Sequence, residues 1–317
     1  MIKAFCFLMF LLFPMMSFAE TNDIIQDAES LYNATRVVCS GISDEIAHVA
    51  NISKANTVIT TTGTVTAGGA LVAGIKKSQK EKEIESLIND ICENGGCDID
   101  KVNAMSDAEF FEKVMQPFAE IAELQNRIEQ SKKFGNWRTG LMAGTAGANL
   151  ASAIISGLNI DQSDLVQHIT ACNEMVKNIA DMEIQLKMAG VNPMENPIVN
   201  QLGSVSTWCN QIDINDIEKV EKRMKGVMGT SIAGTAIGVV GAGTSAMANS
   251  NKYMDISNKT KLSEQDKKKE QVLNTTANVM AGANVATGTV ETGLNISLIA
   301  LTNKLIASAQ RCEGILK

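Results

Sequence analysis

Aromatic residues are scarce in this sequence, which has 9 Phe, 2 Tyr and 2 Trp among 317 residues. Five of the Phe residues lie near the N-terminus, so few rings remain for the rest of the chain. Mixed α/β enzymes of this length normally use many more aromatic side chains, because rings provide the largest buried area per residue. The composition therefore argues against such an enzyme and favours a helical protein whose core is built from small side chains.

The sequence also lacks the motifs that carry common enzyme chemistry. It contains no nucleophile elbow, no HExxH zinc motif and no phosphate-binding loop with its lysine. Residues 239–246 (VVGAGTSA) resemble the glycine turn that binds dinucleotides, but the surrounding pattern is helical and lacks the required strands. The two histidines, His48 and His168, are expected to be surface residues near acidic groups rather than metal ligands. We therefore expect no catalytic residue, no cofactor and no metal site.

Positive charge is in deficit, with 28 Lys and Arg against 35 Asp and Glu, so the formal net charge is −7. Nucleic acids and anionic lipid surfaces attract basic proteins rather than acidic ones. We therefore expect no binding to nucleic acid.

The first 19 residues have the pattern of a secretory signal peptide. Lys3 is followed by a short uncharged apolar run, and the segment ends in Ser17-Phe18-Ala19. We predict cleavage after Ala19 and an exported protein, located in the periplasm, at the cell surface or in the medium. Cys6 is removed with this segment, so an even set of cysteines remains, which predicts disulfides in an oxidising compartment.

An internal repeat organises the mature chain. AGANLASAIISGLNI at residues 146–160 recurs with one extra residue as AGANVATGTVETGLNI at residues 281–296. Each copy is preceded by a cysteine and another glycine-rich stretch, and each is followed by a second cysteine. This order predicts an all-α protein made of two tandem antiparallel helical hairpins with coiled-coil-like packing.

The domain boundaries follow from the positions of proline and charge. Residues 190–208 hold two of the three mature prolines and almost no charge, so we interpret them as a linker. The first hairpin then covers 20–189, with a head at about 92–118, and the second hairpin covers 209–317.

Small side chains recur in each glycine-rich segment with a 4-3-4 spacing, which is the spacing of a heptad. Glycine lowers helix stability by about 1 kcal/mol relative to alanine, so several glycines in one stripe indicate a close approach between helix backbones. The four stripes therefore predict tight pairing of antiparallel helices. They are Gly63, Ala67, Ala70 and Gly74; Gly140, Gly144, Gly147 and Ala151; Gly234, Gly238, Gly241 and Ser245; and Gly282, Ala286, Thr289 and Gly293.

The stripes favour one disulfide scheme. Bridges from Cys39 to Cys172 and from Cys209 to Cys312 bring the stripes of each hairpin opposite each other, which leaves Cys92 to pair with Cys97 across a short turn. The alternative pairs Cys172 with Cys209 and Cys39 with Cys312. In the favoured scheme, the residues placed opposite each other are Gly63 and Ala148, Ala67 and Gly144, Gly74 and Trp137, Gly238 and Ala283, Gly241 and Met280, and Gly234 and Thr287.

Most of the mature aromatic residues cluster toward one end of the first hairpin. The ordinary interpretation is a small local core that closes the end of the hairpin. The alternative is a surface for a protein partner, because exposed aromatic side chains are typical binding anchors. The candidate contact residues are Phe110, Phe111, Phe118, Phe134 and Trp137.

Two functions from different classes follow. The first is an exported, disulfide-stapled, elongated helical protein with a structural role or a binding role, whose partner is another protein or a second copy of this chain.

The alternative is a membrane-inserted or pore-forming helical protein, because each glycine-rich segment has the length of a span and few charges. The spans would be about 56–75, 139–160, 226–250 and 271–303. Glu291 inside the fourth segment and the basic residues just before the third count against insertion. We therefore expect a soluble or peripheral protein rather than an inserted one.

Overall fold

The computed structural model of this protein describes residues 22–93, 117–158, 163–254 and 262–317. Within these ranges every regular element is a helix and none is a strand, which confirms the predicted all-α fold. The predicted signal peptide and most of the predicted head lie outside the described residues.

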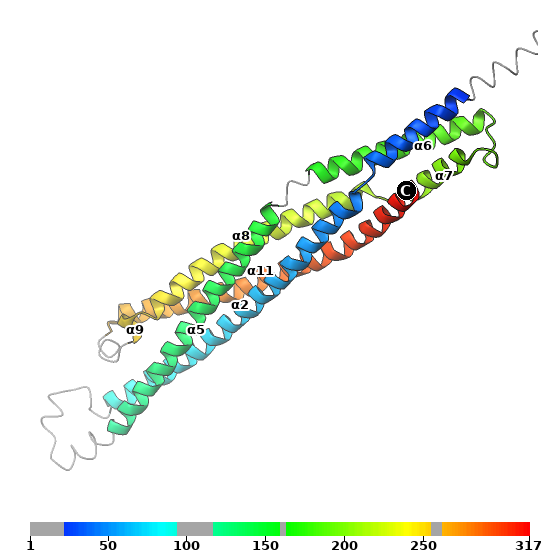
Figure 1. Ribbon diagram of the computed structural model, residues 1–317. Helices are drawn as coiled ribbons and strands as arrows, with labels where there is room; N and C mark the ends of the chain where they lie inside the picture. Colours follow the sequence, from blue (N-terminus) through cyan, green and yellow to red (C-terminus); the bar gives the residue numbers. More distant parts are fainter. Residues whose placement is uncertain (1–21, 94–116, 159–162, 255–261) are drawn as a thin grey trace, which may run out of the picture. The chain divides into compact units, whose positions relative to one another are not determined.

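The described helices are long (Figure 1). α2 has 52 residues and α11 has 53, lengths that are typical of coiled coils rather than of ordinary globular helices. A first helix covers residues 22–38. It is followed by α2 (Ile42–Glu93), α5 (Pro117–Leu158), α6 (Ser163–Met188), α7 (Pro197–Cys209), α8 (Ile214–Ala248), α9 (Asn251–Met254) and α11 (Glu264–Leu316).

Glycine and capping side chains determine several helix ends. The first helix gives way to α2 at Gly41, whose φ of 83° strongly favours glycine. α6 is followed by Gly190 with a φ of 78°, in a turn whose N–H groups donate to carbonyls of the last helical turn. α7 begins after Asn196, whose side chain accepts a hydrogen bond from the Ile198 N–H, and has Pro197 in its first turn. These breaks therefore have an ordinary local cause.

The chain divides into two compact units, each assembled from separate stretches of sequence. Unit 1 comprises Met1–Ala55, Ser156–Lys225 and Leu294–Lys317, and unit 2 comprises Asn56–Ile155 and Gly226–Gly293. Each unit takes residues from both predicted hairpins, whose boundaries stay a prediction.

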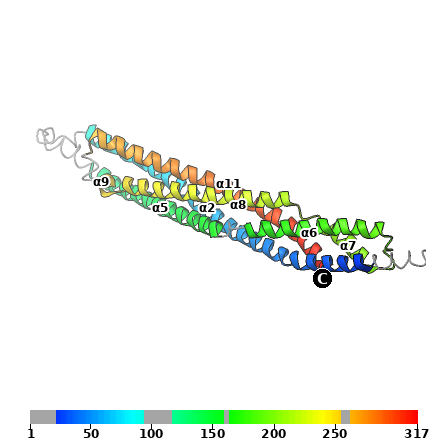
Figure 2. The same cartoon turned by 90° about the horizontal axis from the view of Figure 1, so that it is seen from above.

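Unit 2 contains segments of α2, α5, α8 and α11 that run side by side (Figure 1 and Figure 2). Along each neighbouring pair the residue numbers rise on one helix and fall on the other, so unit 2 is an antiparallel four-helix bundle. The facing pairs are Gly63–Ala148 and Gly69–Leu141 between α2 and α5, Ala146–Gly238 and Arg138–Ser245 between α5 and α8, Gly234–Thr287 and Gly241–Met280 between α8 and α11, and Thr60–Thr292 and Lys77–Asn274 between α2 and α11.

The core of unit 2 follows a heptad on every helix, with buried positions three and four residues apart. Polar side chains and glycines make up much of this core. The buried heptad positions are Thr60, Gly63, Ala67, Ala70, Gly74 and Lys77 on α2; Arg138, Met142, Thr145, Asn149 and Ser152 on α5; Ser231, Gly234, Gly238, Gly241 and Ser245 on α8; and Asn274, Ala277, Ala281, Asn284, Gly288 and Glu291 on α11.

Two of the four predicted small-residue stripes lie in this core. The stripes of α2 and α8 are buried at every position. Three predicted pairings are confirmed, because the residues face each other across the helix pairs. They are Gly63 with Ala148, Gly241 with Met280 and Gly234 with Thr287.

The predicted stripes of α5 and α11 are wrong. Both helices carry a second heptad of mixed polarity, and the core takes this stripe, in which polar residues such as Arg138, Ser152 and Asn274 find hydrogen-bond partners on other helices. Gly74 accordingly faces Arg138 instead of Trp137, which is exposed. The stripe residues that lie outward are Gly140, Gly144, Gly147, Ala286, Thr289 and Gly293, while Ala151 and Gly282 are half-buried.

In unit 1, α6 packs against α7. α7 occupies the second half of the stretch interpreted as a linker, and it buries apolar residues such as Leu202 and Val205. Pro197 therefore marks the start of a packed helix, a position where its missing N–H costs nothing.

Candidate functional site

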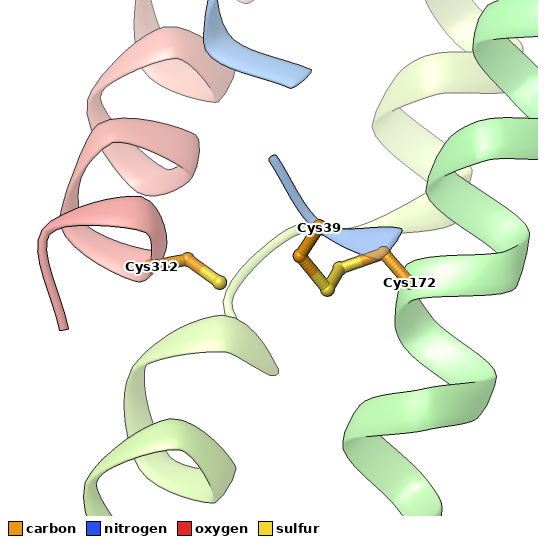
Figure 3. A group of neighbouring side chains, drawn as sticks. All are labelled: Cys39, Cys172 and Cys312. Atoms are coloured by element: carbon orange, nitrogen blue, oxygen red, sulfur yellow. A yellow bond between two sulfur atoms is a disulfide. The ribbon is translucent and has the colours of Figure 1, made fainter. Parts of the chain in front are cut away.

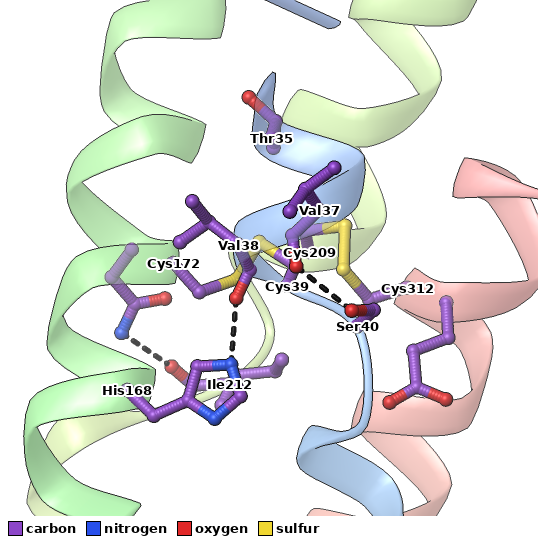
Figure 4. Close-up of a disulfide and its surroundings, with 12 residues drawn as sticks. Thr35, Val37, Val38, Cys39, Ser40, His168, Cys172, Cys209, Ile212 and Cys312 are labelled. Carbon is purple, nitrogen blue, oxygen red and sulfur yellow. Dashed lines mark hydrogen bonds between the residues drawn. A yellow bond between two sulfur atoms is a disulfide. The ribbon is translucent and has the colours of Figure 1, made fainter. Parts of the chain in front are cut away.

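Two disulfides lie close together in unit 1. Cys39 bonds Cys172 and Cys209 bonds Cys312, and all four cysteines are buried. Figure 3 shows the Cys312 side chain directed toward the Cys39–Cys172 bridge, and Figure 4 shows both bridges. These are the two bridges predicted from the helix register, so the alternative pairing is wrong. The predicted bridge between Cys92 and Cys97 lies outside the described residues.

Hydrogen bonds beside the bridges join the same helices. His168 Nε2 lies 2.7 Å from the Val38 carbonyl oxygen (Figure 4), and its Nδ1 lies 3.0 Å from Glu45 Oε1. The Asn173 side chain donates to the Ile212 carbonyl oxygen at 3.2 Å. Both ring nitrogens of His168 are therefore engaged with protein groups and serve to hold α6 against the turn before α2.

The sulfur atoms of Cys39, Cys172 and Cys312 lie within 4.8 Å of one another (Figure 3). Three thiolates at such spacing suit a soft metal such as zinc. Here each sulfur belongs to a disulfide, which leaves no thiolate to act as a ligand. The cluster therefore acts as a covalent staple in the oxidised protein.

One end of the unit 2 core holds two buried cations, Lys77 and Arg138. Lys77 Nζ donates to the Ala248 carbonyl oxygen at 3.1 Å and to Asn274 Oδ1 at 2.9 Å, and it pairs with Glu81 at 3.2 Å. Ala248 is the last residue of α8, where carbonyl groups lack helical partners. Lys77 therefore caps α8 from the neighbouring helix α2.

Arg138 uses its guanidinium to join α5 to two other helices. Its Nε donates to Ser245 Oγ at 2.8 Å, and its two terminal nitrogens donate to Asn278 Oδ1 at 3.1 Å and to Asn274 Oδ1 at 2.8 Å. Asn274 in turn donates to Glu81 at 2.8 Å. We call this set the cation network. It links all four helices of the bundle, which a planar guanidinium with several donors does better than an ammonium. Its members are Lys77, Glu81, Arg138, Ser245, Asn274 and Asn278.

The electrostatics of the cation network are governed by burial. Loss of solvation lowers the pKa of Lys77 to about 8, against the opposing attraction of Glu81. Burial also lowers the pKa of Arg138, which Glu81 again opposes. The two cations are therefore held mainly by neutral amide, hydroxyl and carbonyl oxygens.

A second polar layer in the bundle contains Thr60, Ser152, Ser231 and Glu291, one residue from each helix and all fully buried. We call it the carboxyl layer. Glu291 Oε1 lies 2.5 Å from Ser152 Oγ and also contacts Ser231 Oγ, while the two serine oxygens are 3.1 Å apart. Glu291 Oε2 is buried and has no hydrogen-bond partner in the structure. The residue that counted against membrane insertion thus points into the bundle.

The outer surface of unit 2 is uncharged along much of its length. Residues 56–75, 139–155, 226–251 and 271–293 contain one charged residue, the buried Glu291. We call the exposed residues of these four ranges the outer belt. Twenty helical residues span about 30 Å, so the belt has that approximate height. Its large apolar members are Val58, Val65, Val72, Ile75, Leu150, Ile154, Ile232, Val239, Val240, Met247, Val272, Val279 and Val290.

Threonine hydroxyls on the belt are satisfied by their own helices. Thr62, Thr244 and Thr289 each donate to the carbonyl oxygen four residues earlier, at 2.9, 3.0 and 2.7 Å. This local bond is typical of threonine in apolar surroundings. The core of the bundle holds buried polar side chains such as Asn149 and Glu291 beside an apolar cluster of Ala70, Met142 and Ala281.

Two of the five aromatic residues predicted as partner contacts have described side chains. Trp137 is 58% exposed, and Lys133 Nζ lies 6.0 Å from its ring centre. Phe134 is half-buried, with Lys76 Nζ 5.6 Å from its ring centre. Both rings lie where the outer belt ends and exposed lysines begin. Phe110, Phe111 and the side chain of Phe118 lie outside the described residues.

Sequence reasoning missed the cation network and the carboxyl layer, although a signal was present. Lys77 follows Gly74 by three residues and so continues the buried stripe of α2. Glu291 continues the heptad of Asn284 and Gly288 on α11 in the same way. The heptad spacing therefore predicts that these residues are buried, provided that polar side chains are allowed at core positions.

Comparison of the chain with protein-family models, with curated proteins and with solved structures gives no match.

Proposed function

We propose that this is an exported, non-enzymatic helical protein whose unit 2 is anchored in a membrane through the outer belt. The paired disulfides of unit 1 support an oxidising compartment outside the cytoplasm. The observation that carries the proposal is the uncharged, apolar belt present on all four helices of the bundle.

The belt suits a bilayer in height and chemistry. A hydrocarbon core is about 30 Å thick, which helical segments of roughly 20 residues cross. Two helical stretches, Asn22–Leu87 (the first helix with most of α2) and Pro197–Ala248 (α7 with α8), each contain an 18-residue window apolar enough to span a membrane, and only 33% and 28% of those windows are buried. An apolar window with most of its residues exposed suits a helix that faces lipid.

The positions of the charged side chains support the same proposal. Ionisable residues in membrane helices face the bundle interior, as Glu291 does within the outer belt and as Lys77 and Arg138 do at its edge. Exposed Trp137 and Lys133 lie where the belt ends, and tryptophan and lysine are typical of membrane–water interfaces.

Alkaline extraction of membranes from cells that express the full chain tests the proposal. We expect the protein to stay in the membrane pellet and to dissolve only with detergent. Recovery in the alkaline supernatant would contradict anchoring.

A paired substitution on the belt sharpens this test. Val65→Lys combined with Val239→Lys places charges at positions that are 69% and 60% exposed. Each lysine costs about 2.5–3.5 kcal/mol in the centre of a membrane helix, so we expect the double variant to leave the membrane fraction. Ile184→Lys, on α6 of unit 1 and 55% exposed, is the matched control and should fractionate like the unmodified chain.

A second candidate function is binding of a second copy of this chain through the exposed aromatic residues. One observation favours it, the 58% exposure of Trp137, since large exposed rings commonly anchor interfaces. In that case Trp137→Ala lowers self-association by at least tenfold in sedimentation equilibrium, while the extraction behaviour of the chain is unchanged.

A further inference from the structure

We propose that the carboxyl layer is a buried proton-binding site, in which Glu291 keeps its carboxyl proton at neutral pH and donates it to Ser231. Release of that proton at alkaline pH loosens unit 2. The site lies within the bundle, so the proposal does not depend on whether the outer belt faces lipid or water.

Counting hydrogens supports the protonated state. Four contacts need a hydrogen: Glu291 Oε1 with Ser152 and with Ser231, Ser231 with Ser152 at 3.1 Å, and Ser231 with the Val227 carbonyl oxygen at 2.8 Å. An ionised carboxylate only accepts, so the two serines would supply two hydrogens for these contacts. A carboxylic acid adds a third, and the three shortest contacts are then all filled, with Ser152 donating to Glu291, Glu291 to Ser231, and Ser231 to Val227.

The free oxygen of Glu291 leads to the same conclusion. Oε2 is buried without a hydrogen-bond partner, which is far more costly for a carboxylate than for the carbonyl oxygen of a neutral acid. The hydroxyl groups that contact Glu291 are those of Ser152 on α5 and Ser231 on α8, while Thr60 on α2 lies beside the neighbouring Thr292. Residues 56–75, 139–155 and 226–251 of those helices contain no charged or titratable side chain that could stabilise an anion.

The layer gives the bundle a dependence on pH. In the unfolded chain this carboxyl loses its proton near the ordinary pKa of a glutamic acid, whereas the folded chain keeps it. Raising the pH above that value therefore favours the unfolded chain progressively, until the folded bundle itself releases the proton. Ionisation would leave a charge beside the hydroxyl groups of Ser152 and Ser231, and the bundle must then admit water or separate its helices.

Infrared spectroscopy of the purified full-length protein tests the protonation state directly. At neutral pH we expect a carbonyl stretching band of a protonated carboxylic acid that is present in the unmodified chain and lost in Glu291→Gln. Glu264→Gln, on the same helix at a position 81% exposed, is the matched control and should keep the band. Absence of the band from the unmodified chain at neutral pH would overturn the proposal.

A titration covers the case in which Glu291→Gln does not fold. In the unmodified chain, the acid band should disappear as the pH is raised, and amide hydrogen exchange in α11 should become faster by more than the intrinsic effect of pH on exchange. Glu264→Gln, which keeps Glu291, should behave in the same way. Where Glu291→Gln does fold, its thermal midpoint should rise relative to the unmodified chain as the pH increases. A constant difference across the pH range would contradict the proposal.

Discussion

Buried polar residues dominate the behaviour of unit 2 at the scale of single side chains. Lys77, Arg138 and Glu291 are fully buried, and each is joined to other helices through hydrogen bonds. Removing one partner of such a set leaves the others buried and unsatisfied, which costs more than the bond itself contributes. Single substitutions in these layers should therefore have larger effects than substitutions of the surrounding alanines.

Lys77 should make the protein more stable at alkaline pH. Its pKa is lowered to about 8 in the folded state, against an ordinary value of 10.5. Between these values the unfolded chain binds the proton that the folded chain has released, so raising the pH favours folding. The gain is about 3 kcal/mol over this range. Because loss of the Glu291 proton acts in the opposite direction in the same chain, the gain is measured by denaturant unfolding as the difference between the unmodified chain and a Lys77 variant at a series of pH values.

Lys77→Met provides the comparison, because it keeps the length of the side chain and removes the proton. We expect the stability of the unmodified chain relative to this variant to increase by about 3 kcal/mol as the pH rises through this range. The exposed neighbour Lys76→Met is the control and should leave the pH dependence unchanged. A pH-independent difference for Lys77→Met would contradict the prediction.

Arg138 should be among the most sensitive positions in the chain. Arg138→Ala removes the donors for Ser245, Asn274 and Asn278 and should lower the free energy of unfolding by about 3–5 kcal/mol. Arg138→Lys should recover only part of this, because one ammonium cannot reach all three acceptors in the same way. Chemical denaturation measures both, with the exposed Lys133→Ala as control. Full recovery by lysine would contradict the role assigned to the planar guanidinium.

The residue scale is also where prediction from the sequence was weakest. The buried glycines of α2 and α8 were predicted, because small residues at heptad spacing are typical of helices that pack closely. The burial of Arg138 and Glu291 was not, because hydrophobic patterning assumes that charged side chains face outward. Their true positions depend on partners such as Asn274 and Ser231, which belong to other helices and are distant in the sequence.

At the scale of helices, glycines on α2 and α8 make room for large side chains from α5 and α11. Gly241 lies against Met142 and Met280, and Gly74 lies against Arg138 and Asn278. In the bundle core, a helix with small side chains thus packs against a helix with larger ones. Because the glycines leave room for these larger side chains, the two backbones can lie close together.

Two glycines on α8 provide a matched pair that tests this packing. A Cβ at Gly238 would lie 2.9 Å from the Ala146 Cβ and 3.0 Å from its Cα, whereas nothing lies within 4 Å of a Cβ at Gly243. Gly238→Ala should therefore destabilise the bundle by about 1–3 kcal/mol through overpacking. Gly243→Ala should stabilise it by about 0.5–1 kcal/mol, because alanine is the better helix former.

Thermal unfolding followed by circular dichroism compares the two variants. If Gly238→Ala and Gly243→Ala change the thermal midpoint equally, α8 lies farther from α5 at Gly238 than in the structure.

Prediction at this scale succeeded where a pattern had one physical solution. Helix type, length and antiparallel pairing followed from the stripes and the repeat. The stripe of α5 was assigned to the wrong face, because Gly140, Gly144 and Gly147 look like a packing surface until Thr145 is known to donate to the Gly63 carbonyl oxygen and Asn149 is known to be buried. α7 was interpreted as linker, because prolines and low charge are equally typical of a connection.

For the whole molecule, the two disulfides are the feature that the sequence determined best. In an antiparallel helix pair, the register that brings two cysteines together also decides which small residues face each other. The cysteine spacing and the glycine spacing are independent patterns, and both had to fit the same register. Peptide mapping of the oxidised protein should yield one linked pair containing Cys39 and Cys172 and another containing Cys209 and Cys312. A peptide that links Cys172 to Cys209 would contradict this connectivity.

Reduction should weaken the protein strongly. The bridges join residues 133 and 103 positions apart, and the loss of a native disulfide typically costs about 2–5 kcal/mol. We expect the thermal midpoint to fall in reducing agent, and to fall by a smaller amount in the Cys39→Ser, Cys172→Ser double variant, which retains the second bridge. An unchanged midpoint after verified reduction of both bridges would contradict this expectation.

The order of these bridges along the chain also bears on how the protein is made. Cys39 and Cys172 both precede Cys209 and Cys312, so the two bridges are neither nested nor crossed. During export the first bridge can close before the third of these cysteines has been translocated, and the second bridge closes afterwards without disturbing it. Cys92 and Cys97 emerge between Cys39 and Cys172, so oxidation strictly in the order of emergence would pair Cys39 with Cys92 first. Maturation of the Cys39–Cys172 bridge should therefore require a disulfide isomerase, whereas Cys209 and Cys312 are consecutive cysteines and can pair directly.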